Sequence, residues 1–254
     1  MQSPVDLGIA DRVALVTGAS KGLGRGIAAA LAAEGARVAI SSRSQERIRG
    51  AAEETGARLA LVHDSGDLDG VDGLVAQVEG ELGPVDILVT NTGGPPPGPD
   101  PLGFTRQQWE DAYRSLVLFP LALVERVLPG MRERTWGRIV NVSSSSVREP
   151  IDGLMLSNAH RTGTLAAFKT ISRQVAADGV TVNSLLTGRI ATDRILDMAG
   201  SREAAEEAAR REVPAGRLGA VEEYAAVAAF LCSEPARYVT GAALPVDGGL
   251  LRSL

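Results

Sequence analysis

The chain has 254 residues and a formal net charge of −5, with 44% hydrophobic and 22% charged residues. This composition is ordinary for a soluble globular protein, and the length allows one large α/β domain or two small ones. The negative net charge gives no basic footprint for nucleic acid, and no apolar run reaches the roughly 18 residues that a membrane span needs.

Apolar, β-branched segments alternate with helical patterns along the chain. The first segment, 12–18, ends in a glycine turn, and the helical pattern over 22–36 has Gly35 near its C-cap. Continuous apolar strands separated by helices indicate a parallel sheet that is covered on both faces. The predicted strands, about seven in number, lie at 12–18, 37–41, 58–64, 85–91, 137–143, 179–186 and 242–249.

Two segments depart from this alternation. The stretch "GGPPPGPDPLG" at 93–103 cannot continue a helix or a central strand, so it is either a domain linker or an active-site loop. Alternation resumes beyond it, which favours an ordered active-site loop. The charged pattern at 199–216 predicts a helix, either a plain surface helix or a mobile lid. No linker or repeat divides the chain, so we expect one domain over residues 1–254.

Cysteine content and the N-terminal sequence bear on the cellular compartment. Cys232 is the single cysteine, which excludes an intrachain disulfide and fits a reducing cytoplasm. It lies in "AAVAAFLCSEP", a pattern that predicts a helical core residue. The N-terminal stretch "MQSPVDLGIADR" lacks the basic and apolar regions of a signal peptide. We therefore expect a soluble, cytoplasmic protein.

The stretch "TGASKGLG" at 17–24 joins the first predicted strand to the first predicted helix. Gly18 permits a tight turn, while Gly22 and Gly24 let the backbone approach a pyrophosphate at the positive end of the helix. A glycine cluster alone is a weak signal, and a tight turn without a ligand is the alternative. Its place between a strand and a helix favours dinucleotide binding.

The end of the second predicted strand indicates which dinucleotide is bound. A carboxylate there would bind the ribose 2′-hydroxyl of NAD, but the sequence is "ISSRS", with Ser42 and Arg43 and no acid. Lys21 in the glycine turn adds a second cation. A 2′-phosphate needs cations and hydroxyl donors, so we predict NADP(H) as the cofactor. The alternative is that Arg43 is a solvated helix-capping residue.

Together these motifs resemble the short-chain dehydrogenase/reductase family, especially its 3-oxoacyl-carrier-protein reductase-like members. "TGASKGLG" fits the family's TGxxxGxG turn, "TNTG" resembles its NNAG motif, and "TGRIAT" resembles PGxxxT with Thr187 in place of proline. The resemblance implies a Rossmann-type three-layer αβα sandwich. The cofactor-binding residues it implies are Gly18, Ser20, Lys21, Gly22, Leu23, Gly24, Ser42, Arg43, Asp64, Asn91, Gly93, Arg161, Gly188, Ile190 and Thr192.

The catalytic pattern departs from that family, whose active site is usually Asn, Ser, Tyr and Lys with a YxxxK spacing. Ser144 in "VNVSS" matches the family's serine. Thirteen residues later, the tyrosine position holds Ser157, the lysine position holds Arg161, and the asparagine position holds Ser115. We take these four residues as the candidate catalytic set. No other YxxxK occurs, because lysine does not follow four residues after Tyr113, Tyr224 or Tyr238.

These substitutions alter the proton chemistry of carbonyl reduction. In the family, a tyrosine with an unperturbed pKa of about 10 protonates the product. A serine hydroxyl is far less acidic and falls roughly 4 Å short of a tyrosine's oxygen. Arg161 stays protonated, so it supplies charge and hydrogen bonds to the nicotinamide ribose but relays no proton. Helical spacing places Ser157 and Arg161 on one face.

Three sources of a proton remain open at this point. A water held by Ser144 and Ser157 could fill the space of the missing ring. His160 has a suitable pKa, but it lies about 100° around the helix from Arg161, which favours a surface or interface position. A substrate carboxylate that pairs with Arg161 could place a different atom near the nicotinamide. Ser144 itself could be one more polar residue at a strand end.

Two functions fit the sequence. The first is an NADP(H)-dependent oxidoreductase that transfers hydride to or from a small carbonyl or alcohol substrate, with a non-standard proton donor. The second is a catalytically inactive NADP(H)-binding protein with a sensor or assembly role. The resemblance also implies a homo-oligomer, a tetramer or a dimer, and the apolar stretch at 116–131 could bury a shared face. We expect no metal site, no nucleic-acid partner and no membrane partner.

Overall fold

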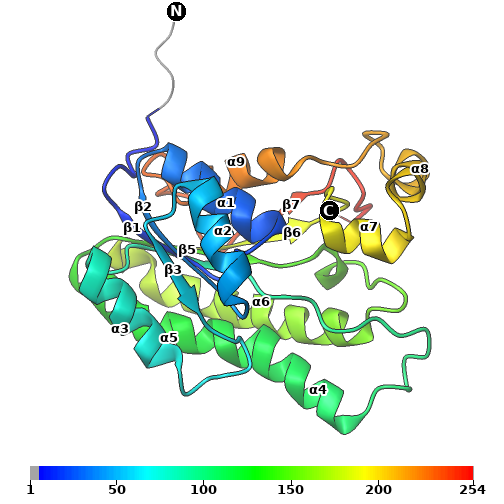
Figure 1. Cartoon of the computed structure of the whole chain (residues 1–254), viewed down its shortest axis with the longest axis horizontal. Helices are drawn as coiled ribbons and strands as arrows, with labels where there is room; N and C mark the ends of the chain where they lie inside the picture. The colour runs from blue at the N-terminus through cyan, green and yellow to red at the C-terminus, as the bar shows by residue number, and fades with distance from the viewer. Residues whose placement is uncertain (1–5, 254) are drawn as a thin grey trace, which may run out of the picture.

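The structure is a computed structural model that describes residues 6–253. Residues 1–5, which belong to the stretch used for the signal-peptide prediction, and residue 254 lie outside the described residues. Seven strands form one parallel sheet in the order β3-β2-β1-β4-β5-β6-β7, which confirms the predicted fold class (Figure 1). The strands are β1 (Val13–Val16), β2 (Arg37–Ser42), β3 (Leu59–Val62), β4 (Ile87–Thr90), β5 (Gly137–Val142), β6 (Val180–Thr187) and β7 (Ala243–Val246).

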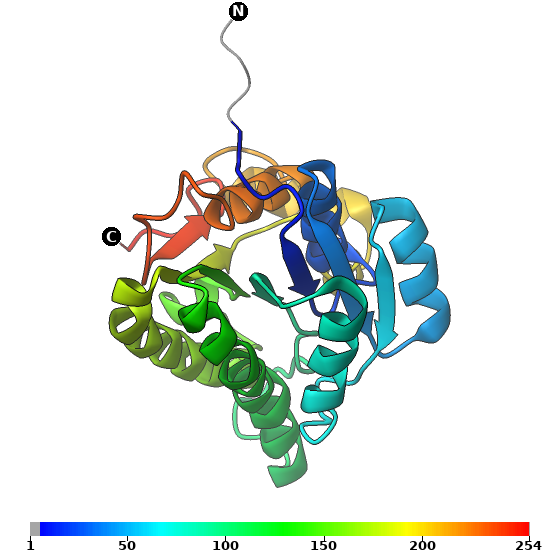
Figure 2. The same ribbon diagram turned by 90° about the vertical axis from the view of Figure 1, so that its left-hand side faces the viewer.

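Helices cover both faces of this sheet, as Figure 2 shows from one end. Apolar residues of α1, α2 and α9 form one hydrophobic cluster with the sheet, and those of α3, α5 and α6 form another on the opposite face. Because both faces are covered, the central strands are apolar without alternation. The helices are α1 (Gly22–Ala33), α2 (Gln45–Thr55), α3 (Val71–Leu82), α4 (Arg106–Tyr113), α5 (Phe119–Glu133), α6 (Met155–Val175), α7 (Asp193–Ala199), α8 (Arg202–Glu212) and α9 (Val221–Leu231).

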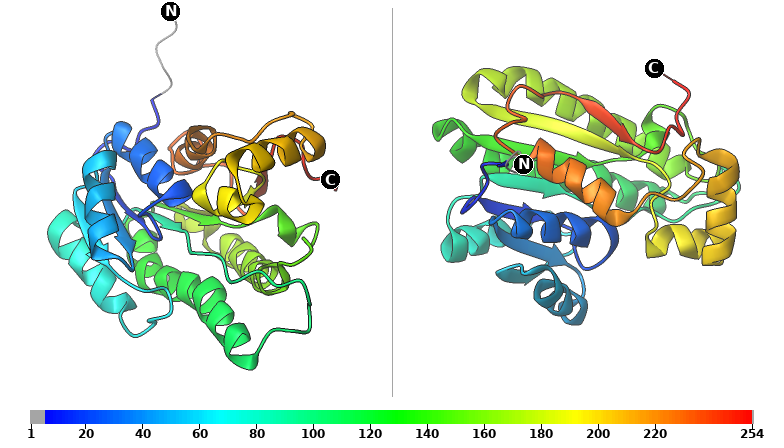
Figure 3. Two further views of the ribbon diagram at one scale, coloured as in Figure 1. Left: turned by 45° about the vertical axis from the view of Figure 1, so that its right-hand side comes forward. Right: turned by 90° about the horizontal axis from the view of Figure 1, so that it is seen from above.

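The carboxyl ends of the strands meet along one edge of the sheet, because all the strands run parallel. The glycine turn follows β1, the loop at 91–105 follows β4, and Ser143 follows β5. Helices α7 and α8 lie at this end of the molecule, which is clearest in the view from above in Figure 3. Strand β1 stands between β2 and β4, so the order of the strands reverses there, where α/β proteins of this kind bind ligands.

The apolar stretch at 116–131 does not form one regular helix. A π-helical turn spans Arg114–Leu118, and α5 begins at Phe119. Pro120 has no amide hydrogen to donate to the carbonyl of Leu116, four residues earlier. The Thr164 hydroxyl of α6 donates to that carbonyl instead, at 2.6 Å. The irregular turn is therefore held against α6.

The proline-rich segment at 93–103 contains neither helix nor strand, as expected from its sequence. The charged segment at 199–216 contains α8, which confirms a helix there. Cys232 is buried at the C-cap of α9. None of the helices among residues 6–253 is long and apolar enough to cross a membrane.

Arg138 of β5 is the largest fully buried side chain among the described residues. Its guanidinium donates to the carbonyls of Ser233 at 3.0 Å and Gly137 at 2.9 Å, and to the Glu234 carboxylate at 3.0 Å. It also lies over the Trp136 ring, 4.3 Å from the ring centroid. These contacts tie β5 to the segment that follows α9.

We expect Arg138→Met to lower the free energy of unfolding by about 3 kcal/mol or more, since it leaves buried carbonyls without donors. Arg237 is a matched control, because it also pairs with Glu234 but is 75% exposed. Arg237→Met should change stability by no more than about 0.5 kcal/mol. Urea titrations followed by circular dichroism measure both, and equal effects of the two substitutions would contradict this account.

Candidate active site

The glycine turn is braced against the strand next to it. Gly18 has φ +58°, and a Cβ there would lie 2.5 Å from the Asn91 carbonyl oxygen. The Asn91 side chain donates from Nδ2 to the Gly18 carbonyl at 2.9 Å, and the Thr17 hydroxyl donates to the Asn91 carbonyl at 2.9 Å. Only a residue without a side chain fits at 18, so the backbone of the turn stays open on its outer side.

The first turn of α1 has the features of an anion site. Lys21 is its N-cap and offers no side-chain acceptor to the first amides of the helix. The Lys21 ammonium lies 3.4 Å from the Asp193 carboxylate of α7, and both side chains are exposed. Thr192 borders the turn, 3.5 Å from the position a Cβ would take at Gly22. These residues fit the pyrophosphate of a dinucleotide at the positive end of the helix.

The residues predicted to hold the adenosine half lie at the ends of β2 and β3. Ser42 pairs with Val62 in the sheet, and the amide of His63 donates to the Ser42 carbonyl at 3.0 Å. Ser44, not Arg43, caps α2, by accepting from the Arg47 amide at 3.4 Å. The Arg43 side chain is exposed and has no ion pair within residues 6–253. Asp64, on the neighbouring β3 end, is also exposed and accepts from the Gly66 amide.

Ser144 stands where β5 ends and a short 3₁₀ turn (Ser145–Val147) begins. Its Oγ accepts from the Ser146 amide at 3.1 Å, so it caps this turn. The hydroxyl hydrogen of Ser144 remains free to donate elsewhere. Ser144 therefore has a structural role as a cap at the end of β5. It also offers a free hydroxyl donor at the carboxyl edge of the sheet.

Ser157 and Arg161 follow one another on one face of α6, as the helical spacing predicted. Ser157 is buried, and its hydroxyl has no hydrogen-bond partner among the described residues. The Arg161 guanidinium donates from Nη1 to the Val142 carbonyl at 2.8 Å, at the last residue of β5. Burial and, to a lesser extent, the positive charge of Arg194 lower the pKa of Arg161 to about 10. No carboxylate within residues 6–253 forms an ion pair with Arg161.

Ser115 lies in the π-helical turn, and its hydroxyl donates to the Asp111 carbonyl of its own helix at 2.9 Å. Its one hydrogen is thus already used. His160 lies on the other side of α6, where its ring packs against Trp109 and Tyr113 at centroid distances of 5.3 Å and 6.0 Å. Its Nδ1 faces the Leu156 carbonyl at 2.7 Å. His160 is therefore half-buried between α6 and α4.

The segment after β6 carries the remaining predicted residues. Gly188 donates to the Val246 carbonyl at 3.1 Å, and a Cβ there would overlap Asp247. Ile190 is buried and pairs with Gly219. Gly22, Gly24, Ser20 and Leu23 lie in or beside the glycine turn, while Gly93 lies exposed just after Asn91.

Sequence reasoning missed two residues of this region. Arg194 of α7 donates to the carbonyls of Gly94 at 3.1 Å and Pro95 at 3.2 Å. Tyr224 of α9 is fully buried, and its hydroxyl accepts from the Thr187 hydroxyl at 2.9 Å. The one sequence signal for Arg194 is its place two residues after Thr192. Tyr224 gave no signal beyond the absence of a lysine four residues later.

This sheet order, with a glycine turn at the point where the order reverses, defines a Rossmann-type α/β protein. A family model described as enoyl-(acyl carrier protein) reductase matches residues 18–251. Acetoacetyl-CoA reductase from Rhizobium meliloti is 35% identical over 241 residues, which cover 94% of this chain and 98% of that protein. The 3-oxoacyl-[acyl-carrier-protein] reductase FabG from Escherichia coli is 33% identical over 249 residues, or 94% of this chain and 97% of its own.

Solved structures agree with the sequence relatives. The crystal structure of L-sorbose reductase from Gluconobacter frateurii, complexed with NADPH and L-sorbose, has a TM-score of 0.91 and 31% identity. The likeness covers 98% of this chain and all of that one. The chain belongs to the short-chain dehydrogenase/reductase family, whose 3-oxoacyl-carrier-protein reductase-like members it resembles. Its relatives are oxidoreductases, and the predicted family is confirmed.

The setting of Arg161 predicts an unusual mutational result. Arg161 has one carbonyl acceptor and no carboxylate partner among the described residues, whereas Arg138 has several acceptors. Because a half-buried cation without a carboxylate partner contributes little to folding, Arg161→Met should change the free energy of unfolding by no more than about 1 kcal/mol. Urea titration beside Arg138→Met tests this, and a loss as large as that of Arg138→Met would refute it.

Proposed function

We propose that this protein binds NADP(H) and transfers hydride to or from a small carbonyl or alcohol substrate, with a proton donor other than tyrosine. The observation that carries the proposal is the meeting of three features at one sheet edge. These are the braced glycine turn after β1, the Ser144 hydroxyl after β5, and the Arg161 guanidinium on the last carbonyl of β5. A dinucleotide seated at the glycine turn extends along this edge toward Ser144.

The choice of NADP(H) rests on the end of β2. The exposed Arg43 side chain has no carboxylate partner in the described part of the chain, and Ser42 adds a hydroxyl beside it. A 2′-phosphate there would gain a charge-assisted hydrogen bond. The related L-sorbose reductase was solved with NADPH, which supports the same choice here.

The cofactor and two residues of the chain have separate roles in the proposed reaction. The bound nicotinamide supplies or accepts the hydride. Ser144 keeps its hydroxyl hydrogen free, so it donates to the substrate oxygen and fixes its position. Arg161 holds its charge at neutral pH because its pKa, though lowered by burial, stays near 10. That charge orients the cofactor's ribose and stabilises negative charge on the substrate oxygen.

Ser157, one helical turn before Arg161, is buried and has a hydroxyl with no hydrogen-bond partner among the described residues. It is too weak an acid to replace tyrosine, so it holds a water molecule that delivers the proton. His160 is a poorer donor, because its ring packs on Trp109 and its Nδ1 faces a carbonyl of its own helix. The water-mediated route is therefore the one that we propose.

An inactive NADP(H)-binding protein is the second candidate. The specific observation in its favour is Ser115, whose hydroxyl donates to Asp111 within its own helix. With Ser157 and Arg161 in place of tyrosine and lysine, three of the four family positions differ. Under this alternative the chain acts as a sensor or an assembly partner.

The predicted domain organisation, cellular location and oligomeric state of the protein also remain proposals. One domain spans residues 1–254, the protein works in the cytoplasm, and it associates as a dimer or a tetramer. The support for association is that Tyr238 is 99% exposed, and that Phe230 and Leu244 also leave apolar surface exposed. Size-exclusion chromatography with light scattering measures the oligomeric state.

We expect Arg43→Ala to weaken NADPH binding by about 10-fold or more and to leave NADH binding within about 2-fold, because Arg43 faces only the 2′-phosphate. Fluorescence titration of each dinucleotide measures both affinities. Arg47→Ala, on the same end of α2, is the matched control for loss of a positive charge. Equal weakening of NADPH and NADH binding would contradict the assignment of Arg43.

Activity separates the two candidate functions. We expect NADPH oxidation with at least one carbonyl, imine or enone in a broad panel, and we expect Ser144→Ala to lower kcat/KM by about 10²-fold or more. Ser143→Ala, one residue away, controls for disturbance of the turn. The triple variant Ser115→Asn, Ser157→Tyr, Arg161→Lys should raise carbonyl reduction by restoring the usual acid. Tight NADPH binding without turnover in either protein would favour the inactive candidate.

A further inference from the structure

Arg161 and Arg194 are anchored at the ends of neighbouring strands. Arg161 donates to the Val142 carbonyl at the end of β5, and Arg194 donates to the Gly94 and Pro95 carbonyls in the loop after β4. Strands β4 and β5 are paired in register up to Thr90 and Asn141. The two guanidinium groups therefore lie at the same stretch of the sheet edge, and the charge of Arg194 acts on Arg161.

Neither arginine is balanced by a carboxylate within residues 6–253. Asp193, the residue next to Arg194, pairs with Lys21 at 3.4 Å instead. Both guanidinium groups donate only to backbone carbonyls, which carry no net charge. Two positive charges held close together repel one another, and this repulsion is relieved when an anion binds between them.

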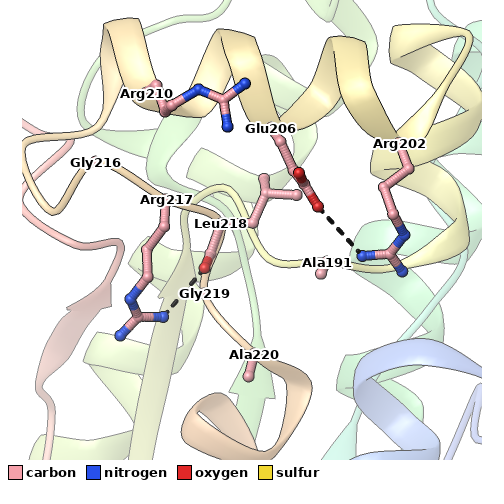
Figure 4. A pocket seen from close by; sticks show the side chains of 9 residues that line it. All are labelled: Ala191, Arg202, Glu206, Arg210, Gly216, Arg217, Leu218, Gly219 and Ala220. Carbon is pink, nitrogen blue, oxygen red and sulfur yellow. Dashed lines mark hydrogen bonds and ion pairs between the residues drawn. The ribbon is translucent and has the colours of Figure 1, made fainter.

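Arg202 and Arg210 of α8, and Arg217 in the segment after it, differ in this respect. They line a cavity of about 240 Å³ between α8 and the segment 216–220 (Figure 4). Arg202 pairs with Glu206 at 3.6 Å, and Arg217 pairs with Glu223 at 2.7 Å. Most positive charge in that cavity is already balanced, so it has less need of an anionic ligand.

The structure around Gly94 holds Arg194 in place. A Cβ at Gly94 would overlap the guanidinium of Arg194, so the arginine lies flat against the backbone there. A side chain on residue 94 would displace it. The proline-rich loop thus fixes the position of the second cation, which is a role for this loop beyond its expected place in the active site.

We propose that Arg161 and Arg194 together bind the carboxylate of the substrate, which makes the substrate class an oxo acid or a hydroxy acid. This inference rests on the proposed oxidoreductase function and narrows its substrate. A carboxylate accepts hydrogen bonds from both guanidinium forks, which suits arginine more than lysine. It would hold the reacting carbonyl beside Ser144 through a contact to a group that does not itself react.

The cofactor's own phosphates are the competing anions. The pyrophosphate belongs at the first turn of α1, where Lys21 and the free amides lie, and the 2′-phosphate belongs at Arg43. The hydrogen-bond donors and positive charges at both phosphate sites come from residues other than Arg161 and Arg194. The test below separates the two sources, because it measures cofactor and acid binding independently.

The experiment compares pyruvate, levulinate and phenylpyruvate with their methyl esters. Affinities are measured by calorimetry on the protein saturated with NADP⁺, which cannot reduce the oxo compounds, and again without the cofactor. For at least one pair, we expect the acid to bind about 10-fold or more tightly than its ester. Arg161→Gln and Arg194→Gln should each reduce this preference to about 3-fold or less. Arg210→Gln, which removes an exposed charge from α8, should retain it.

Each alternative outcome is decisive. Equal binding of acid and ester, no acid binding in any pair, or a preference that survives both glutamine substitutions would overturn the proposal. Weaker NADPH binding in Arg194→Gln with an unchanged acid preference would assign that arginine to the cofactor and also overturn it. If the native protein fails to bind NADPH, the proposed function fails, while the cofactor-free titrations still judge the carboxylate site. Circular dichroism checks that each variant is folded.

Discussion

The parallel direction of all seven strands brings the segments that follow them, which carry most candidate residues, to one edge of the sheet. The turn after β1, the loop after β4 and the 3₁₀ turn after β5 begin from adjacent strands, so residues far apart in the chain become neighbours. The contact between Gly18 and Asn91 fixes two of these segments relative to one another. The Arg161 side chain then spans from α6 to the end of β5 and joins the third. The sheet thus sets the positions of the site residues. Only a few side chains supply the chemical groups of the site.

Arg138, which is buried, and Arg161, which is half-buried, show how stability and binding separate. Arg138 is saturated by carbonyls and by Glu234, and it binds the sheet to the end of α9. Arg161 has one acceptor in the described part of the chain, and burial lowers its pKa. A cation held in this way contributes little to folding and is prepared for an anion, which is the pattern expected of binding sites rather than of structural networks.

Much of the fold and part of the site follow from local sequence. Continuous apolar runs predicted the seven strands, because a parallel sheet covered on both faces removes the alternation of open sheets. The i, i+4 spacing placed Ser157 and Arg161 on one face of α6. The π-helical turn was not predictable, since it depends on Pro120 together with a hydroxyl from Thr164 on another helix. Arg194 was missed for the same reason, because its partners at Gly94 and Pro95 lie about a hundred residues away.

Tyr224 shows why the missing acid is not replaced from within the core. It is the tyrosine whose ionised form Arg161 would favour, yet burial raises its pKa and its hydroxyl faces Thr187 and the Leu185 carbonyl. A proton held there is directed into the sheet, away from a substrate beside Ser144. In the proposed function Arg161 offers a different solution, because a nearby cation would stabilise the oxyanion that hydride transfer leaves on the substrate. A stabilised oxyanion can be protonated by water after the transfer, so the strength of the acid matters less than the position of the charge.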